Sequence, residues 1–382
     1  MSQQICKRHL VYVITEDWFF ASHFLDRAKA ALTAGYSVTV VTRCRETAAQ
    51  LEELGISLVN IEFSRRGLNP LREISTVLKL RTILRKLHPD IVHNIALKPV
   101  VLGSLAAQLA RVRNVVNAPV GMGYVFTSDD TRARFLRPFV KQMIRYVLSR
   151  RDSRVVIENN DDLVNLINGK FAQRNSIALI RGAGVDLDKF KQSDQPEISG
   201  EIIVIMVSRM LRDKGVEEFV QAARLIAQNR TTARFLLVGD IDDGNPTSIT
   251  RKQLNDWNRE SNIRWLGPRT DISELLATSH IACLPSYREG LPKFLTEAAA
   301  SGRPIVTTDV PGCREVVVDG DNGFLVPPRN AERLAQALTN LIDDSALRKQ
   351  MGVRGRKKAE LEFANEIVIR QTHNVYDLFR SS

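Results

Sequence analysis

Apolar residues in the first half of the chain gather in short runs, and segments with helical periodicity separate these runs. Several runs are nearly continuously apolar instead of alternating, which is typical of parallel strands covered by helices on both faces. This pattern predicts a doubly wound, Rossmann-like sheet. We expect its strands at residues 9–15, 37–43, 57–63, 90–96, 114–120, 154–160 and 177–181.

A second series of the same kind begins at Glu201, with strands expected at 202–208, 233–239, 262–267, 281–285 and 304–308. Between the two series, Gly182 and Gly184 precede a polar stretch without periodicity, which indicates a hinge. A length of 382 residues suits two domains. We therefore predict an α/β protein with Rossmann-like domains at 1–185 and 186–364, which face each other across a ligand-binding cleft.

Residues 281–301 carry the most informative pattern of the second half. A buried strand is followed by a break at Glu289 and Gly290, and Pro292 suits the first position of the helix that comes next. In this arrangement the backbone N–H groups of residues 290–294 point to one place, with the positive end of the helix dipole behind them. The segment is expected to bind an anion.

Two carboxylates, Glu289 and Glu297, flank this anion site, with seven residues between them. Carboxylates accept hydrogen bonds from sugar and ribose hydroxyls, so the pair suggests a ligand with both a phosphate and a polyol. Taken singly, Glu297 is also explained as an acid at a helix start, and Glu289 as part of a solvated turn.

Together with the Gly-Leu-Pro between them and the strand before them, the two acids resemble the Glu-x7-Glu motif of retaining nucleotide-sugar glycosyltransferases of the GT-B fold, in particular family 4. Segments 302–309 and 319–326 are similar to the same family. The resemblance implies that the last helix, within residues 365–382, packs back on the first domain. It also implies a catalytic role for Glu289 and donor binding by Glu297, Gly290, Leu291, Pro292 and Lys293.

Arg209 follows the strand expected at 202–208, and Lys214 lies five positions further on. Their Ser-Arg-x4-Lys-Gly spacing matches the phosphate-binding pair of the family, with Arg209 as a rigid fork and Lys214 as a point charge. Ordinary surface basicity is the alternative, and it explains Arg212 between them. The resemblance therefore assigns Arg209 and Lys214 to the diphosphate of the donor.

Gly239 and Arg269 follow the next two expected strands. In the family, these loops border the nucleobase, whose edge is read by backbone groups. The resemblance places Gly239 and Arg269 there, although simple strand-ending turn chemistry explains either residue equally well.

The first half departs from the family after its first strand. Many members carry a Gly-rich loop there, whereas residues 15–23 form a loop without glycine. Glu16 and Asp17 in this loop nevertheless resemble a subgroup that builds bacterial surface polysaccharides and lipid-linked oligosaccharides. The resemblance places both acids on the acceptor side.

His93 lies at the end of another expected strand, where the subgroup often has His-x-His and then a lysine. Here Ile95 replaces the second histidine, while Lys98 matches the lysine. The resemblance implies a catalytic His93, with Lys98 and the turn residue Gly121 on the acceptor side, although a lone strand histidine is as readily a core residue. No side chain stands out as a general base, and retaining enzymes of this fold are thought to let the leaving phosphate take the proton.

The formal net charge of +11 implies an anionic partner. Basic residues interleave with apolar ones in two places, residues 65–86 (with Leu78, Leu80 and Leu84) and the helix expected at 131–151. Such faces suit an anionic bilayer, although a core-packed helix with a solvated basic face shows the same pattern.

The four scattered cysteines indicate neither a disulfide framework nor a zinc site, and no signal peptide or transmembrane segment is recognised. We predict a cytoplasmic protein that is peripheral on the inner face of the cytoplasmic membrane.

The combined prediction is a metal-independent, retaining transferase. It moves a sugar, expected from the subgroup to be an N-acetylhexosamine, from UDP to a polyprenyl-diphosphate-linked glycan. No Asp-x-Asp motif sits at a strand end to hold a metal. Two rivals are a UDP-sugar 2-epimerase of similar shape and a non-enzymatic protein that binds nucleic acid or membrane. An NAD enzyme is disfavoured because no Gly-x-Gly-x-x-Gly follows a first strand.

Overall fold

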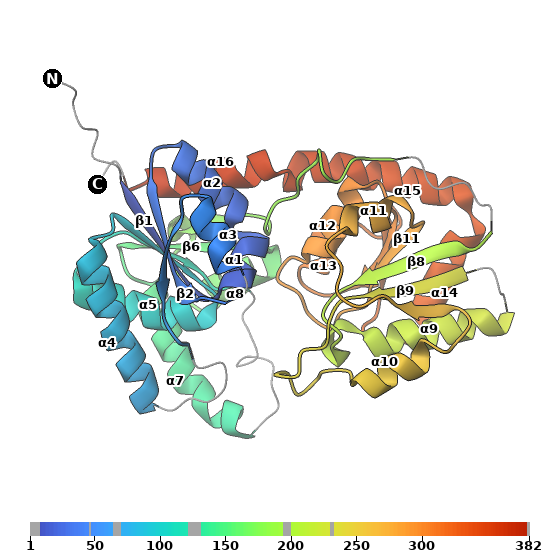
Figure 1. Cartoon of the computed structure of the whole chain (residues 1–382), viewed down its shortest axis with the longest axis horizontal. Helices are drawn as coiled ribbons and strands as arrows, with labels where there is room; N and C mark the ends of the chain where they lie inside the picture. Colours follow the sequence, from blue (N-terminus) through green and yellow to red (C-terminus); the bar gives the residue numbers. More distant parts are fainter. Residues whose placement is uncertain are drawn as a thin grey trace. The chain divides into compact units, whose positions relative to one another are not determined.

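A computed structural model of the chain describes residues 8–45, 47–63, 70–120, 131–193, 200–229 and 233–379. The chain divides into unit 1, which is Met1–Ala183 with Val368–Ser382, and unit 2, which is Gly184–Ile367. The sequence analysis set the corresponding boundaries at residues 185 and 364. Figure 1 labels the elements of both units along the chain.

Unit 1 is organised around a parallel sheet with the strand order β3-β2-β1-β4-β5-β6-β7. The order reverses between β1 and β4, and ligands bind at such switch points in doubly wound sheets. The strands are β1 (His9–Glu16), β2 (Ser37–Arg43), β3 (Ser57–Asn60), β4 (Ile91–Ile95), β5 (Val115–Ala118), β6 (Ser153–Ile157) and β7 (Ile177–Leu179).

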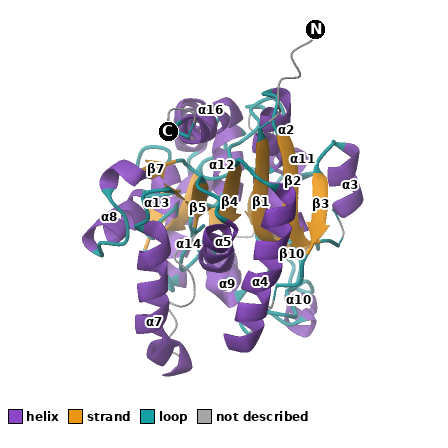
Figure 2. Cartoon of the chain, turned by 90° about the vertical axis from the view of Figure 1, so that its left-hand side faces the viewer, coloured by secondary structure: helices purple, strands orange, loops and turns teal. Residues whose placement is uncertain are grey.

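Helices cover both faces of this sheet, as the apolar runs predicted. Along β1, Leu10, Tyr12 and Ile14 belong to one buried cluster, and Val11 and Val13 belong to another. Successive residues of a strand point to opposite faces, so β1 must be apolar throughout. The first face packs against α1 (Asp17–His23), α2 (Leu25–Thr33), α3 (Ala48–Glu53) and α16 (Asn365–Asp377). The other face packs against α4 (Pro70–Leu87), α5 (Leu97–Ala110), α7 (Thr131–Leu148) and α8 (Asn160–Asn168) (Figure 2).

Unit 2 contains a second parallel sheet, with the order β10-β9-β8-β11-β12-β13 and a switch point between β8 and β11. Its strands are β8 (Ile202–Val207), β9 (Ala233–Val238), β10 (Ile263–Trp265), β11 (Ile281–Leu284), β12 (Ile305–Thr308) and β13 (Gly323–Val326). Its helices are α9 (Val216–Asn229), α10 (Arg251–Trp257), α11 (Ile272–Ala277), α12 (Lys293–Ala300), α13 (Cys313–Val316), α14 (Ala331–Asp343) and α15 (Ser345–Lys358).

Every strand expected from the sequence is present, most of them a few residues shorter, whereas β13 was not predicted. The prediction of a loop at 15–23 is wrong, because Asp17–His23 forms helix α1. Phe20 of this helix packs into the core. Leu80 and Leu84, grouped above with a basic surface, are buried on the core side of α4, while Leu78 is exposed.

Helix α16 completes the core of unit 1, to which its residues Val368, Val375 and Tyr376 contribute. Tyr376 is fully buried, and its hydroxyl lies 2.8 Å from Nδ1 of His93 and 3.1 Å from the hydroxyl of Tyr12. The last helix is thus attached to β1 and β4 by hydrogen bonds as well as by apolar contacts. No described helix is both long enough and apolar enough to span a bilayer.

We expect Tyr376→Phe to lower the free energy of unfolding by about 1–3 kcal/mol, because it leaves buried partners without their hydrogen bond. Urea unfolding measures this change. Tyr146→Phe is the matched control, since Tyr146 of α7 is exposed and its hydroxyl contacts Gln108 of α5 at the surface; its effect should stay within about 0.5 kcal/mol. Equal effects of the two substitutions would contradict a structural role for the Tyr376 hydroxyl.

Candidate functional site

The predicted anion site of unit 2 lies at the switch point of its sheet. Parallel strands β8 and β11 are neighbours, and their carboxyl ends lie at the same edge. The segment after β8 carries Arg209 and Lys214, and the segment after β11 carries Glu289. The topology therefore brings together residues that are far apart in the sequence.

Backbone contacts hold these two segments against each other. The N–H of Tyr287 donates to the carbonyl of Asp213 over 2.9 Å, and the Ser286 hydroxyl donates to the same carbonyl over 3.1 Å. Gly215 has a φ of +77°, and a Cβ there would lie 2.1 Å from the Pro285 carbonyl oxygen. A glycine is therefore required where the segments approach most closely.

Lys214 and Glu289 form an ion pair at this junction. Nζ of Lys214 lies 2.6 Å from Oε1 of Glu289, and the side chains are 22% and 10% exposed. A pair so far removed from water is sensitive to the loss of either partner, since the remaining charge would be left uncompensated. The structure thus joins one residue of the predicted phosphate pair to one acid of the Glu-x7-Glu pattern.

Helix α12 begins beside this pair, at Lys293, one residue later than predicted, and Pro292 is its N-cap instead of its first residue. Proline offers no side-chain acceptor, so the cap leaves the first N–H groups of the helix to other acceptors. Gly312 approaches from the next loop, where a Cβ would lie 2.3 Å from the Gly290 carbonyl oxygen. Leu291, between these residues, is buried.

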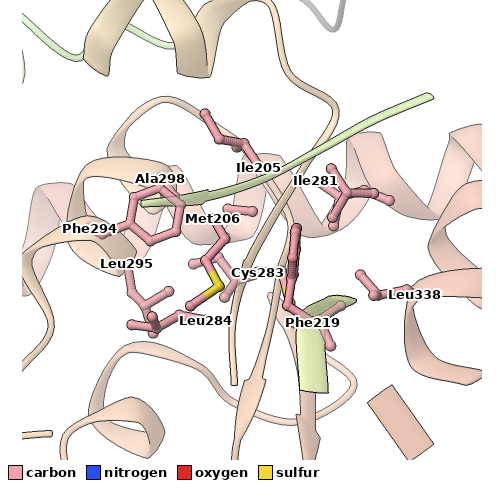
Figure 3. Packing of buried hydrophobic residues seen from close by; sticks show 14 of the residues in the cluster. Ile205, Met206, Phe219, Ile281, Cys283, Leu284, Phe294, Leu295, Ala298 and Leu338 are labelled. Carbon is pink, nitrogen blue, oxygen red and sulfur yellow. The ribbon is translucent and has the colours of Figure 1, made fainter. Parts of the chain in front are cut away.

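Apolar packing fixes the direction of α12. Leu295 and Ala298 are fully buried and belong to the cluster that contains Leu284 of β11 and Met206 of β8 (Figure 3). The positive end of the helix therefore has a set position relative to the strands that carry the site.

Glu297 lies within α12 and is nearly buried, with 8% of its surface exposed. Nζ of Lys293 lies 3.6 Å from its carboxylate, one helical turn away. Burial raises the pKa of Glu297 above its ordinary value, and the charges of Lys293 and Lys189 oppose that rise in part. An acid held like this is expected to accept hydrogen bonds readily from a ligand that excludes water.

Arg209 is half exposed, and its Nη1 donates to Oδ2 of Asp242 over 2.7 Å. Gly239 has a φ of +138°, and a Cβ there would lie only 1.8 Å from the Ser208 carbonyl oxygen. Arg269 is exposed and pairs with Asp271 on its own loop. Within the described residues, no ion pair joins Arg269 to Glu289.

The two acids predicted on the acceptor side are buried in unit 1. Glu16 ends β1 and pairs with Arg43 at the end of β2, over 3.3 Å. Asp17 accepts hydrogen bonds from the backbone N–H groups of Trp18 and Arg45, over 2.8 and 2.6 Å. These contacts fasten the loop after β2, so the side chains hold the backbone instead of lining an open loop.

His93 does not fit the predicted catalytic role, because its ring is fully buried between Tyr12, Phe24 and Tyr376. Burial lowers the pKa of His93 to about 3, so the ring is neutral at physiological pH. His93 is therefore described by the alternative given in the sequence analysis, a histidine of the core.

Lys98 forms a 2.6 Å ion pair with Glu73 of α4. Gly121 lies outside the described residues. In the part of the chain that the structure describes, no cluster of three or more His, Cys, Asp or Glu side chains is suited to a metal ion.

Sequence reasoning missed two side chains beside the site. Asp242 pairs with Arg209, a contact that the sequence analysis did not predict. Tyr287 donates its hydroxyl to Glu218 of α9 over 2.5 Å, and the guanidinium of Arg329 lies 4.6 Å from its ring centre. Arg329 has a φ of +59°, which is unusual for a residue other than glycine. None of these pairings has a signal in local sequence.

Comparisons with known families give the same division of the chain as the two sheets. The family model described as glycosyl transferases group 1 matches residues 188–358, and the model described as glycosyl transferase 4-like matches residues 9–160. The chain belongs to the family 4-like glycosyltransferases. It is an enzyme of the transferase class.

Solved structures support the GT-B fold of this glycosyltransferase. HepE from Anabaena, in complex with UDP and glucose, superimposes with a TM-score of 0.77 at 19% identity, over 96% of this chain and 99% of that one. Sucrose-phosphate synthase from Thermosynechococcus elongatus superimposes with a TM-score of 0.80 at 18% identity, over 98% and 100% of the two chains.

A curated relative from Campylobacter jejuni is 29% identical over 89% of the glycosyltransferase and 90% of the relative. Its name is N,N'-diacetylbacillosaminyl-diphospho-undecaprenol alpha-1,3-N-acetylgalactosaminyltransferase. A second relative, from Escherichia coli, is 27% identical over 74% of each chain and is named UDP-Gal:alpha-D-GlcNAc-diphosphoundecaprenol alpha-1,3-galactosyltransferase.

The raised pKa of Glu297 yields a test of stability against pH. Protonated Glu297 is more stable in the folded glycosyltransferase than the ionised form, because the side chain is buried. The free energy of unfolding therefore falls as the pH rises from the ordinary pKa of 4.5 through the raised pKa of the folded state. We expect Glu297→Gln to melt at a higher temperature than wild type at pH 8 and at the same temperature at pH 4. Thermal unfolding at both pH values measures this, and a lower melting temperature of the variant at pH 8 would refute it.

Proposed function

We propose that this glycosyltransferase moves a sugar, an N-acetylhexosamine, from a UDP-sugar to a hydroxyl of a polyprenyl-diphosphate-linked glycan during assembly of a bacterial surface polysaccharide. The observation that carries the proposal is the Lys214–Glu289 pair, which lies at the switch point of the second sheet beside the start of α12. Such a position suits a diphosphate joined to a polyol.

The relatives support both substrates. The Campylobacter jejuni and Escherichia coli proteins are named for undecaprenyl-diphosphate-linked acceptors, and the Escherichia coli name also specifies UDP-Gal. The Anabaena neighbour is described in complex with UDP. Because the Campylobacter jejuni relative is named for an N-acetylgalactosaminyl group, it favours an N-acetylhexosamine donor.

In the proposed binding mode, each predicted residue has a distinct task. Lys214, Arg209 and the backbone N–H groups of Gly290, Leu291 and Lys293, before and at the start of α12, bind the diphosphate, while Pro292 contributes no N–H. The carboxylate of Glu289 accepts hydrogen bonds from sugar hydroxyls, and that of Glu297 accepts them from ribose. Backbone groups near Gly239 and Arg269 border the nucleobase.

The proposed reaction proceeds with retention of configuration and without a metal. The bond between C1 of the sugar and the β-phosphate oxygen breaks, while the acceptor oxygen forms a bond to C1 on the same face. The acceptor proton passes to the leaving phosphate oxygen, so the products are UDP and an α-glycoside. Charge builds up on the β-phosphate in the transition state, where Lys214, Arg209 and the N–H groups of α12 stabilise it.

Helix α4 favours contact with an anionic membrane surface. Leu71, Ile74 and Leu78 share one stripe of the helix, and they are 78%, 57% and 49% exposed. Arg72, Lys79, Arg85 and Lys86 are also exposed on α4. Each such cation contributes about 1 kcal/mol near an anionic bilayer. Arg65 and Arg66, predicted to extend this basic cluster, lie outside the described residues.

Substitutions in the ion pair test the reaction. Lys214→Ala is expected to weaken transition-state binding by roughly 2–5 kcal/mol, because the negative charge of the UDP-sugar diphosphate would lose its cation. For the same reason it should weaken UDP binding. Glu289→Gln is expected to stop transfer while UDP still binds. Initial rates with UDP-N-acetylhexosamines and a lipid-linked acceptor, together with calorimetric titration of UDP, measure both effects.

Arg212→Ala is the matched control for Lys214→Ala, because Arg212 lies on the same turn but is 53% exposed and pairs with Glu217. Full transfer activity in Lys214→Ala would refute the site. Conversion of the UDP-sugar in the absence of acceptor would instead support the epimerase alternative.

The membrane contact is tested by replacing Leu71, Ile74 and Leu78 with serine together. The variant should no longer float with vesicles that contain phosphatidylglycerol, because the apolar stripe is lost, yet it should keep full activity on a water-soluble acceptor analogue. Leu361→Ser, at a 66% exposed position of unit 2, serves as the control. Undiminished flotation of the triple variant would exclude α4 as the contact.

A further inference from the structure

The segment after β9 is fixed beside the segment that carries Arg209. The N–H of Met210 donates to the carbonyl of Asp240 over 2.9 Å, and the N–H of Ile249 donates to the carbonyl of Met210 over 2.8 Å. An antiparallel bridge joins Leu211 to Ser248. Because Met210 and Ile249 are fully buried, both ends of the intervening loop are anchored in the core of unit 2.

Asp242 lies within this anchored loop, and its backbone is fixed on both sides. Its N–H donates to the Ser248 hydroxyl over 3.1 Å, and its carbonyl accepts from the N–H of Asn245 over 2.7 Å. The carboxylate is 21% exposed and accepts from Nη1 of Arg209 over 2.7 Å. The acceptor that holds Arg209 is thus itself held in place.

The guanidinium of Arg209 has further donors beyond this one contact. An arginine carries five N–H groups in a planar fork, and one edge of the fork suits two phosphate oxygens. Asp242 is the partner of the Arg209 side chain among the described residues, and Arg209 is half exposed. Its other nitrogens therefore remain for an anionic ligand.

We propose that Asp242 is a positioning residue, which holds one nitrogen of Arg209 so that the remaining donors of the fork bind the diphosphate of the nucleotide. The proposal rests on the function proposed above. An exposed arginine otherwise loses rotamer freedom when it binds a ligand, and the contact with Asp242 removes part of that loss in advance.

The sign of the expected effect separates this role from simple charge repulsion. Removing an acid near an anion site strengthens anion binding, because the Coulomb repulsion between the acid and the anion is lost. Removing a positioning partner weakens anion binding instead. Asp243, next to Asp242 in the same loop, is exposed and carries the same charge. Asp243→Ala therefore reports the charge effect alone.

We expect Asp242→Ala to bind UDP about 3- to 10-fold more weakly than wild type does. Its affinity for uridine, which lacks phosphates, should be unchanged. Asp243→Ala should bind UDP as tightly as wild type or more tightly. Asp242→Asn, which keeps an acceptor oxygen, should fall between Asp242→Ala and wild type. In the Arg209→Ala background, Asp242→Ala should not weaken UDP binding further, because the positioning effect of Asp242 acts through Arg209.

Calorimetric titration of UDP and uridine measures these affinities, and thermal unfolding checks that each variant is folded. Wild-type or tighter UDP binding by Asp242→Ala would overturn the positioning role and leave the proposed reaction standing. Failure of the wild-type protein to bind UDP would overturn the donor assignment and this inference together.

Discussion

The ion pair between Lys214 and Glu289 depends on the parallel sheet of unit 2, and the candidate site depends on the pair. Strands β8 and β11 are adjacent, although their first residues, Ile202 and Ile281, lie 79 positions apart in the sequence. Their shared edge brings together a cation and an acid that no helix or turn could join. Gly215 permits the close approach, and the apolar face of α12 sets the direction of the helix that begins beside it.

Burial decides which candidate residues are available for chemistry. In unit 1, His93, Glu16 and Asp17 lie near the switch point of the sheet, yet their polar atoms contact Tyr376, Arg43 and backbone N–H groups. In unit 2, Arg209 is half exposed and Lys214 partly so. The same arrangement of strands thus gives one unit an edge whose candidate side chains are buried and the other unit an edge with partly exposed cations.

The sequence predicted the sheets well because their strands are apolar runs that need no knowledge of the partner strand. It also predicted the turn before α12, since Gly290 permits turn conformations and Pro292 fixes φ locally. It could not decide between a catalytic and a core role for His93, because Tyr376, one of the residues that bury it, lies 283 positions away. It missed the contact between Arg209 and Asp242 for the same reason, since the two are 33 positions apart, with helix α9 and strand β9 between them.

Helix α16 has a consequence for the order in which the chain folds during synthesis. Its residues Val368, Val375 and Tyr376 belong to the core of unit 1, but they leave the ribosome after all of unit 2. Part of one apolar face of the first sheet therefore stays uncovered while the second unit is being made, although α1, α2 and α3 already pack on that face. Nascent chains of this architecture spend that interval in need of protection from aggregation.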